Sequence, residues 1–149
     1  MTSGHEKSDF RFAHPWRVRY NEIDAQGVVY NAHYLTFFDV AIYEYFRGLG
    51  FLQDQEAKAS GCDFHVVKAL VNYKSPLKFD DEFTIGIRVS RIGRSSITFA
   101  CAILRESVAV PLATGEIVWV YTDQTTKTPL PVPEALLATI ARFEPHLTA

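Results

Sequence analysis

The sequence predicts an α+β fold in which helices are grouped against one antiparallel sheet. Two observations lead to this prediction: a strongly apolar helical segment over residues 31–47, and a series of strand-like segments that fills most of the chain after residue 62. The chain has 149 residues, of which 48% are hydrophobic and 21% charged, so it can bury one substantial core. We therefore predict a single domain over residues 10–149, preceded by a flexible tail at residues 1–9.

The first strand is predicted over residues 16–23, because Pro15 interrupts the segment before it. Alternation places on one face, which begins apolar and is expected to point inward, Trp16, Val18, Tyr20, Glu22 and Asp24. Asp24 would thus stand at the end of a strand on the core-facing side, which is an unusual place for a carboxylate. Gly27 follows three residues later and permits a backbone turn that other residues resist.

The long helix is predicted over residues 31–47, with Asn31 as its N-cap and Gly48 or Gly50 as its stop. Apolar side chains recur at helical spacing at Tyr34, Phe38, Ala41, Tyr45 and Leu49, and this stripe is widened by Leu35, Ile42 and Phe46. A helix that is apolar over so much of its circumference is expected to lie buried. Its N-terminal end, near Asp24, would carry free backbone N–H groups.

The rest of the chain is predicted as a short helix followed by four strands. The short helix covers residues 51–60 and ends at Gly61. The strands cover residues 62–73, 83–92, 96–106 and 113–122, and Pro133 suits the first turn of a terminal helix. A single long helix cannot cover both faces of such a sheet, so we expect a dimer that extends or backs the sheet.

Composition argues against several classes of function. The formal net charge is −2 and the pI is near 6.2, which provides no general electrostatic basis for binding nucleic acid or an anionic membrane. The N-terminus lacks the features of a secretory signal, and no segment reaches the ~20 apolar residues that span a bilayer. We therefore expect a soluble, cytoplasmic protein. Cys62 and Cys101 are expected as buried thiols, and neither a metal site nor a cofactor is predicted.

Asp24 is the strongest candidate for chemistry. A carboxylate beside a helix N-terminus could serve as a general base or as a nucleophile. The amides around residues 30–32 would then face a developing oxyanion. The alternative is that Asp24 only caps the turn through its own backbone.

Other ionisable residues near the helix have weaker support. His33 lies in the first helical turn and could bind substrate or transfer protons, but a surface role is also open. Glu22 shares the face of Asp24 and could pair with it, although we expect Glu22 at an edge position that points to solvent. Asp39 and Glu44 are expected in structural hydrogen bonds.

Basic residues gather near predicted strand ends and turns. They could contact a phosphorylated ligand, or they could simply be solvated: Lys74, Lys78, Arg88, Arg91 and Arg94. The sequence contains no GxGxxG, Walker loop, HExxH or GxSxG motif, so the common nucleotide, zinc-protease and serine-hydrolase classes lack support.

Residues 19–41, RYNEIDAQGVVYNAHYLTFFDVA, resemble the signature of the 4-hydroxybenzoyl-CoA thioesterase family of hotdog-fold proteins, which includes acyl-CoA thioesterases of the YbgC type. The signature has the form D-x-x-G-x-V-Y/W, followed by Y-x-x-x-F/L. It is matched here by Asp24, Gly27, Val29, Tyr30, Tyr34 and Phe38. The segments VNYKSPLKFDDEFTI and GRSSITF are similar to the middle strands of the family, so the resemblance covers about residues 16–125.

The resemblance implies a hotdog fold, in which a curved antiparallel sheet wraps a long central helix. It implies homodimers or homotetramers with the active site at the subunit interface. It also implies hydrolysis of an acyl-CoA thioester, with Asp24 as nucleophile or general base after the strand and Gly27 in the turn. The backbone N–H at or beside Asn31 would polarise the thioester carbonyl.

The same resemblance suggests how substrate would be held. CoA phosphates would be met near Arg94, Ser95 and Ser96. The candidates to contact the acyl group are Tyr30, His33, Tyr34, Phe38 and Phe64. Two other classes stay open: a hotdog enoyl-CoA hydratase or dehydratase, which would use His33 with Glu22 or Asp39, and a non-enzymatic acyl-CoA binding protein.

Overall fold

The computed structural model describes residues 4–148. Within these residues, one antiparallel sheet is formed by β1 (Phe12–Arg17), β2 (Cys62–Tyr73), β3 (Glu82–Ile92), β4 (Ser96–Leu104) and β5 (Ala113–Asp123). The α-helices of the same part of the chain are α1 (His33–Gly48), α2 (Gln53–Ser60) and α3 (Glu134–Phe143). Short 3-10 helices occur at Lys7–Asp9, Tyr20–Glu22 and Pro145–Thr148. The predicted α+β class is confirmed.

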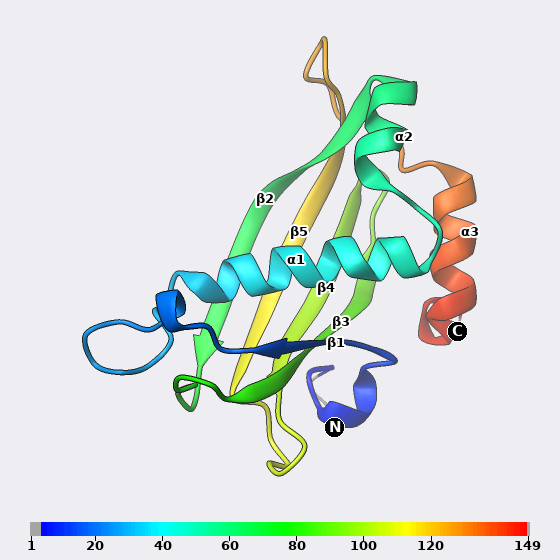
Figure 1. Ribbon diagram of the computed structural model, residues 1–149. Helices are drawn as coiled ribbons and strands as arrows, with labels where there is room; N and C mark the ends of the chain where they lie inside the picture. The colour runs from blue at the N-terminus through cyan, green and yellow to red at the C-terminus, as the bar shows by residue number, and fades with distance from the viewer. Residues whose placement is uncertain (1–3, 149) are drawn as a thin grey trace.

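The strand order in the sheet is β1-β3-β4-β5-β2, and each neighbouring pair is antiparallel. Helix α1 lies across one face, and the strands curve around it (Figure 1). Fully buried side chains of α1 and the sheet meet in this layer, among them Phe37, Phe38, Ile42, Phe46, Ile97 and Phe99. Burial of each large apolar side chain is worth roughly 1.5–3 kcal/mol, so this layer is the main stabilising contact of the fold.

Gly115 in β5 determines how closely α1 approaches the sheet. A Cβ atom at this position would lie 2.4 Å from a ring carbon of Phe38 and 3.1 Å from the carbonyl oxygen of Leu70. The Phe38 ring therefore occupies the space that a side chain would need.

Residues 4–10 cover part of the opposite face of the sheet. The Phe10 ring lies over Gly86, where a Cβ atom would be only 2.7 Å from the ring. Arg88 Nη1 donates a hydrogen bond of 3.1 Å to the carbonyl oxygen of Gly4. Of the predicted flexible tail, residues 1–3 lie outside the described residues, and Gly4 makes the hydrogen bond with Arg88.

The second half of the chain follows the prediction closely. Strand β2 has the predicted bounds, Gly61 ends α2 with a φ of +74°, and Pro133 is the N-cap of α3. Of the two thiols that were predicted to be buried, Cys101 is buried and Cys62 is only partly buried.

The prediction for the first strand is wrong at both ends. Strand β1 begins earlier and includes Pro15, which the sheet tolerates because β1 is an edge strand. After β1 the chain forms a 3-10 helix at residues 20–22, in which Glu22 Oε1 accepts a 2.7 Å hydrogen bond from the Arg19 N–H. As a consequence Tyr20, which was predicted to face inward, is 80% exposed.

The start of the long helix also differs from the prediction. Helix α1 begins at His33, its N-cap residue is Ala32 rather than Asn31, and no side chain caps it. Most of the predicted apolar stripe is buried, but Leu35 is 40% exposed.

Candidate active site

The Asp24–Gly27 motif forms a tight hairpin loop before α1. The Asp24 N–H donates to the Val28 carbonyl oxygen at 2.8 Å, and the Gly27 N–H donates to the Asp24 carbonyl oxygen at 3.0 Å. Gly27 has a φ of +78°, and a Cβ atom there would meet nothing within 4 Å. The glycine is therefore needed for its backbone conformation and not for space, as in three-residue hairpin loops that end in a left-handed residue.

One oxygen of the Asp24 carboxylate accepts a hydrogen bond within this loop. Its Oδ1 accepts a hydrogen bond of 2.8 Å from the Gln26 N–H, which is the turn-capping contact that the sequence left as the alternative. Its Oδ2 accepts no hydrogen bond from the residues that the structure describes, and the residue is partly exposed. The turn therefore orients Asp24 without consuming both oxygens.

The backbone at the start of α1 provides unused donors. The His33 N–H donates to the Tyr30 carbonyl oxygen at 2.9 Å, and the Tyr34 N–H donates to that of Asn31 at 3.3 Å. Between 4 and 148, no residue accepts a hydrogen bond from the N–H of Asn31 or Ala32. Unpaired amides at a helix N-terminus carry a partial positive charge and can bind a carbonyl oxygen or an oxyanion.

Hydrogen bonds hold the Asp24 loop next to this helix start. The Tyr30 N–H donates to the Glu22 carbonyl oxygen at 2.9 Å, and Ile23 forms an antiparallel bridge with Val29. Asp24 and Asn31 therefore lie on the two arms of one short hairpin. A loop presents Asp24, rather than the strand end that the sequence predicted.

Aromatic rings surround the helix start. The partly exposed Tyr30 packs edge-to-face against His33 with ring centroids 5.6 Å apart, and the buried Tyr34 packs against Tyr73 at 5.1 Å. Burial raises the pKa of the Tyr34 hydroxyl. The Tyr73 hydroxyl donates to the Asn31 carbonyl oxygen at 2.9 Å. Sequence reasoning missed Tyr73, because its only signal was an aromatic residue at the end of a strand.

The structure does not assemble the His–acid pair of the hydratase alternative. Among the described residues, no carboxylate contacts His33. Glu22, predicted to point to solvent, is only 9% exposed, and its Oε1 accepts hydrogen bonds from Trp16 Nε1 and the Arg19 N–H. The prediction for Glu22 is therefore wrong, since the carboxylate is used to shape the chain before the loop.

The remaining acids of α1 differ from each other. Glu44 pairs with Arg47 at 3.3 Å, one turn further along the helix. Asp39 makes no hydrogen bond to the described residues, so the prediction of a structural hydrogen bond is wrong for Asp39. It lines a 330 Å³ groove between α1 and β2. Partial burial raises the pKa of its carboxyl.

The other predicted substrate contacts lie apart from Asp24 within one chain. Phe38 is fully buried in the core. Phe64 lines a second cavity of 390 Å³, which is enclosed by α2, α3 and the start of β2. The turn between β3 and β4 carries Arg94, Ser95 and Ser96, at the end of the sheet near α3 (Figure 1).

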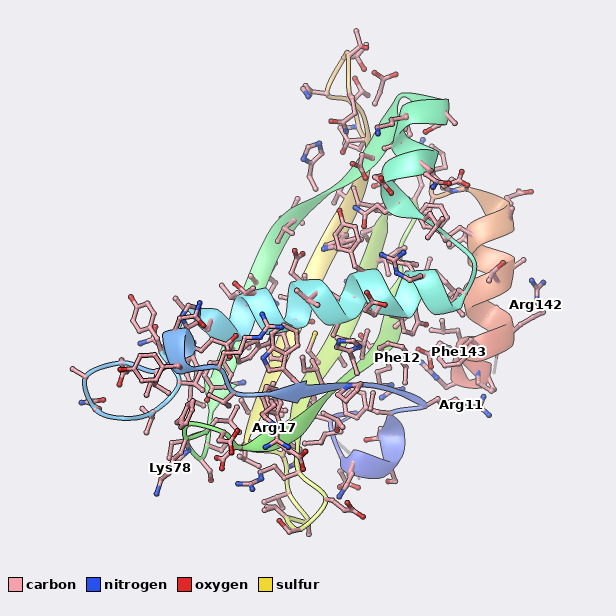
Figure 2. All side chains as sticks on the ribbon, in the orientation of Figure 1. Arg11, Phe12, Arg17, Lys78, Arg142 and Phe143 are labelled. Atoms are coloured by element: carbon pink, nitrogen blue, oxygen red, sulfur yellow. The ribbon has the colours of Figure 1, made fainter. Side chains whose placement is uncertain are left out.

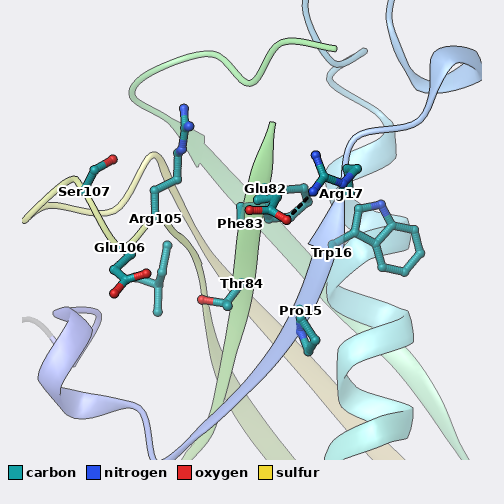
Figure 3. A pocket seen from close by; sticks show the side chains of 10 residues that line it. Pro15, Trp16, Arg17, Glu82, Phe83, Thr84, Arg105, Glu106 and Ser107 are labelled. Atoms are coloured by element: carbon teal, nitrogen blue, oxygen red, sulfur yellow. Dashed lines mark hydrogen bonds and ion pairs between the residues drawn. The ribbon is translucent and has the colours of Figure 1, made fainter. Parts of the chain in front are cut away.

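Another groove contains none of the predicted site residues. It has a volume of 790 Å³ and lies beside the edge strand β1, between β3 and the loop after β4 (Figure 3). Arg17 and Glu82 form an ion pair on its wall, and Arg105 pairs with Asp81 at 3.4 Å. Most charged side chains that line this groove are therefore engaged in ion pairs.

Metal sites and membrane-spanning helices are both lacking in the part of the chain that the structure describes. Over residues 4–148, no group of three or more His, Cys, Asp or Glu side chains is arranged to hold a metal ion. None of the helices in that range is long and apolar enough to cross a membrane.

Known proteins resemble this chain over most of its length. The family described as the thioesterase-like superfamily matches residues 18–140. An acyl-CoA thioesterase YbgC from Haemophilus influenzae is 34% identical over 109 residues, which are 73% of this chain and 80% of that protein. An acyl-CoA thioester hydrolase YbgC from Escherichia coli O6:H1 is 32% identical over 127 residues, 85% of this chain and 93% of that protein. A solved structure of a hypothetical protein from Aquifex aeolicus is 26% identical, with a TM-score of 0.78 over 87% of this chain and 98% of the other.

These matches and the sheet wrapped around α1 identify a hotdog fold. The chain belongs to the thioesterase-like superfamily, and the predicted family is confirmed.

Proposed function

We propose that this protein hydrolyses acyl-CoA thioesters to a free acid and CoA. The observation that carries the proposal is that, among residues 4–148, Asp24 Oδ2 accepts no hydrogen bond and the N–H groups of Asn31 and Ala32 donate none, while Asp24 and Asn31 lie on the two arms of one short hairpin. The names of the Haemophilus influenzae and Escherichia coli relatives support the same reaction.

The thioester carbonyl would lie against the N–H groups of Asn31 and Ala32. These amides stabilise the negative charge that develops on the carbonyl oxygen, and one such donor is typically worth about 3 kcal/mol. Asp24 acts in one of two ways. As a nucleophile, Oδ2 bonds to the carbonyl carbon while the C–S bond breaks, and water then hydrolyses the resulting anhydride. As a general base, Oδ2 takes a proton from the water that attacks the carbon.

Residues around the helix start would contact the acyl group. Tyr30 and His33 present partly exposed rings there, while Tyr34 is buried behind them. Phe38 supports this wall from the core, and Phe64 lines the cavity near α2. The CoA phosphates would be met by the turn that carries Arg94, Ser95 and Ser96.

The active protein would be a homodimer formed through β2, or a homotetramer of two such dimers. Strand β2 is the long edge strand of the sheet, and its apolar side chains Val66, Val67, Leu70 and Tyr73 are exposed. The opposite edge, β1, is short and contains Pro15, two features that protect an edge from pairing. A second copy of the chain would cover the unprotected edge.

Such a dimer would bring the separated site residues together. His65 of β2 and Ser96 of β4 both align with Val120 of β5, so the Arg94 turn lies at the Cys62 end of β2. Antiparallel pairing of two β2 strands puts that end beside Tyr73 of the other copy, which bonds to Asn31. One substrate could then contact Asp24 of one protomer and Arg94 of its partner.

The test is release of free thiol from a panel of acyl- and aroyl-CoA thioesters by the native protein and by D24N. Asparagine keeps an oxygen that can accept the Gln26 N–H, so the loop should survive while the charge is lost. We expect activity to fall by about 10²–10⁴-fold. The matched control is D9N, because Asp9 Oδ2 accepts the Glu6 N–H in the N-terminal 3-10 helix, away from the Asp24 loop.

Each outcome separates the open functions. Equal loss of activity in D24N and D9N would count against a role for Asp24. Tight binding of acyl-CoA without turnover would favour the non-enzymatic binder, and hydration of an enoyl-CoA would favour the hydratase. Location in the cytoplasm stays a prediction, which cell fractionation would test.

A further inference from the structure

Two aromatic rings from distant parts of the chain lie together on the surface. Tyr20, in the 3-10 helix after β1, is 80% exposed, and Phe79, between β2 and β3, is 51% exposed. Their ring centroids are 6.0 Å apart and the rings are nearly perpendicular, at 85°. A Phe ring in this position gains little from the fold, since half of its surface remains in water.

This aromatic pair adjoins the candidate active site. Lys78 forms an antiparallel bridge with Val28 of the Asp24 loop, and the Val29 N–H donates to the Leu77 carbonyl oxygen at 2.8 Å. Tyr20 begins the 3-10 helix that ends at Glu22, two residues before Asp24. Both aromatic residues therefore belong to segments that directly adjoin the Asp24 loop, and both rings are exposed to solvent.

Two positively charged residues, Lys78 and Arg19, directly precede Phe79 and Tyr20 in the chain. The Lys78 side chain extends outward at the end of the molecule that carries the loop before α1 (Figure 2). Its ammonium group pairs with no acid among the described residues. Arg19 stacks over the Trp16 ring at 4.3 Å, and its guanidinium also lacks an acidic partner within residues 4–148. Arg17, by contrast, is paired with Asp80 and Glu82.

The geometry points to a binding platform for the nucleotide end of CoA, with the adenine on Tyr20 and Phe79 and the ribose 3′-phosphate near Lys78, while the turn that carries Arg94 meets the other CoA phosphates. Adenine stacks on aromatic rings, and exposed Lys and Arg groups bind phosphate. This inference rests on the proposed function. It deepens that function, because phosphopantetheine on an acyl-carrier protein has no adenine, so the platform selects CoA thioesters over carrier-protein thioesters.

The main test compares two substrates with the same acyl group. Acyl-CoA carries the nucleotide, whereas acyl-pantetheine lacks it. We expect F79A and Y20A each to lower the ratio of kcat/KM for acyl-CoA to that for acyl-pantetheine by about 10-fold, the scale of one base–aromatic stack. F79Y, which keeps a ring, should retain the native ratio. V110A is the matched control, because Val110 is an exposed apolar residue in a different loop and should not change the ratio.

A second test does not depend on turnover. Calorimetric titration with CoA and with adenosine 3′,5′-bisphosphate should show weaker binding to F79A and to K78A than to the native protein. K78R should bind the bisphosphate more tightly than K78A, because it keeps the positive charge.

The two proposals fail in distinguishable ways. If native protein cleaves acyl-CoA but F79A and Y20A leave both the substrate ratio and CoA affinity unchanged, the platform is overturned and the hydrolase stands. If no thioester is cleaved but CoA binding weakens in F79A, the platform stands and the hydrolase is overturned. Dissociation of the oligomer by either alanine variant would assign the rings to a subunit contact and overturn the platform.

Discussion

The Tyr45 hydroxyl donates a hydrogen bond of 2.9 Å to Glu144 Oε2, and both residues are at most 1% exposed. The same carboxylate oxygen accepts the Val89 N–H at 2.8 Å. Glu144 directly follows α3, so this buried carboxylate ties the end of α3 to the last turn of α1 and to β3. Neither partner takes part in the proposed reaction, so the contact is a structural lock on the C-terminal helix.

Removal of the Tyr45 hydroxyl should weaken this lock. Y45F leaves the buried Glu144 with a single donor at that oxygen, and loss of a buried hydrogen bond to a charged group costs about 1.5–3 kcal/mol. Urea denaturation should therefore show a lower midpoint. Y43F is the matched control, because Tyr43 lies on the same helix but is 39% exposed, and its stability should change by less than about 0.5 kcal/mol. Equal effects of the two variants would contradict the lock.

Alkaline pH should destabilise the protein through two buried groups. Burial raises the pKa of the Cys101 thiol, and burial together with the Glu144 charge raises the pKa of the Tyr45 hydroxyl. In the unfolded chain the thiol ionises at about pH 8.5 and the hydroxyl at about pH 10, while the folded state keeps both protonated. The unfolded state then binds fewer protons, so the free energy of unfolding falls as pH rises above these values.

Variants should separate the two contributions to this pH dependence. C101A should remove the part of the decline in unfolding free energy that begins at about pH 8.5. Y45F should remove the part that begins at about pH 10. C62A is the control for the thiol, because Cys62 is only partly buried. The measurement is the urea midpoint at several pH values from neutral to alkaline. A decline in C101A as steep as in native protein would count against the buried thiol as its source.

A side chain at position 27 should strain the Asp24 loop. Gly27 has a φ of +78°, so G27A should cost about 1–2 kcal/mol of stability even though the space is open. It should also lower thioesterase turnover, because relief of the strain would move Asp24. The control is G48A at the end of α1, where a Cβ atom also meets nothing within 4 Å and should stabilise the helix by up to about 1 kcal/mol. Destabilisation by both variants to the same extent would refute the conformational argument.

A charge at the free edge of β2 should dissociate the proposed dimer. Val67 is 61% exposed on this strand, and V67E would bring two like charges near the two-fold axis of a β2–β2 contact. Light scattering after gel filtration should give the monomer mass for V67E. V110E introduces the same charge at a residue that is 65% exposed elsewhere, and it should keep the native mass. A native mass for V67E would place the subunit contact on another surface.

Local patterns in the sequence account for most elements of the fold. The apolar spacing of Tyr34, Phe38, Ala41 and Tyr45 predicted the buried helix, because side chains three and four residues apart share a helix face. Strand β2 and the stop at Gly61 followed from alternation and from the left-handed conformation that glycine permits. The D-x-x-G turn was predictable for the same reason, since its hydrogen bonds close within residues 24–28.

Prediction failed where side-chain hydrogen bonds, or contacts between distant segments, override the alternation pattern. Alternation extended the first strand to Asp24, but Glu22 accepts hydrogen bonds from Trp16 and Arg19 and turns the chain before that point. Tyr73 reaches Asn31 across 42 residues, a contact that no local pattern encodes. The polar composition of residues 4–9 likewise did not indicate their hydrogen bonds with Arg88 of β3 and with the loop after β4.

The sequence by itself determined the elements, the turn at Gly27 and the residue types available for chemistry, because these depend on interactions between near neighbours in the chain. Tertiary structure alone decided that, within residues 4–148, one oxygen of Asp24 accepts no hydrogen bond and the N–H groups of Asn31 and Ala32 donate none, and that Arg94 lies at the other end of the sheet. Those outcomes depend on how separate segments pack, and packing is set by the whole core rather than by any one stretch of sequence.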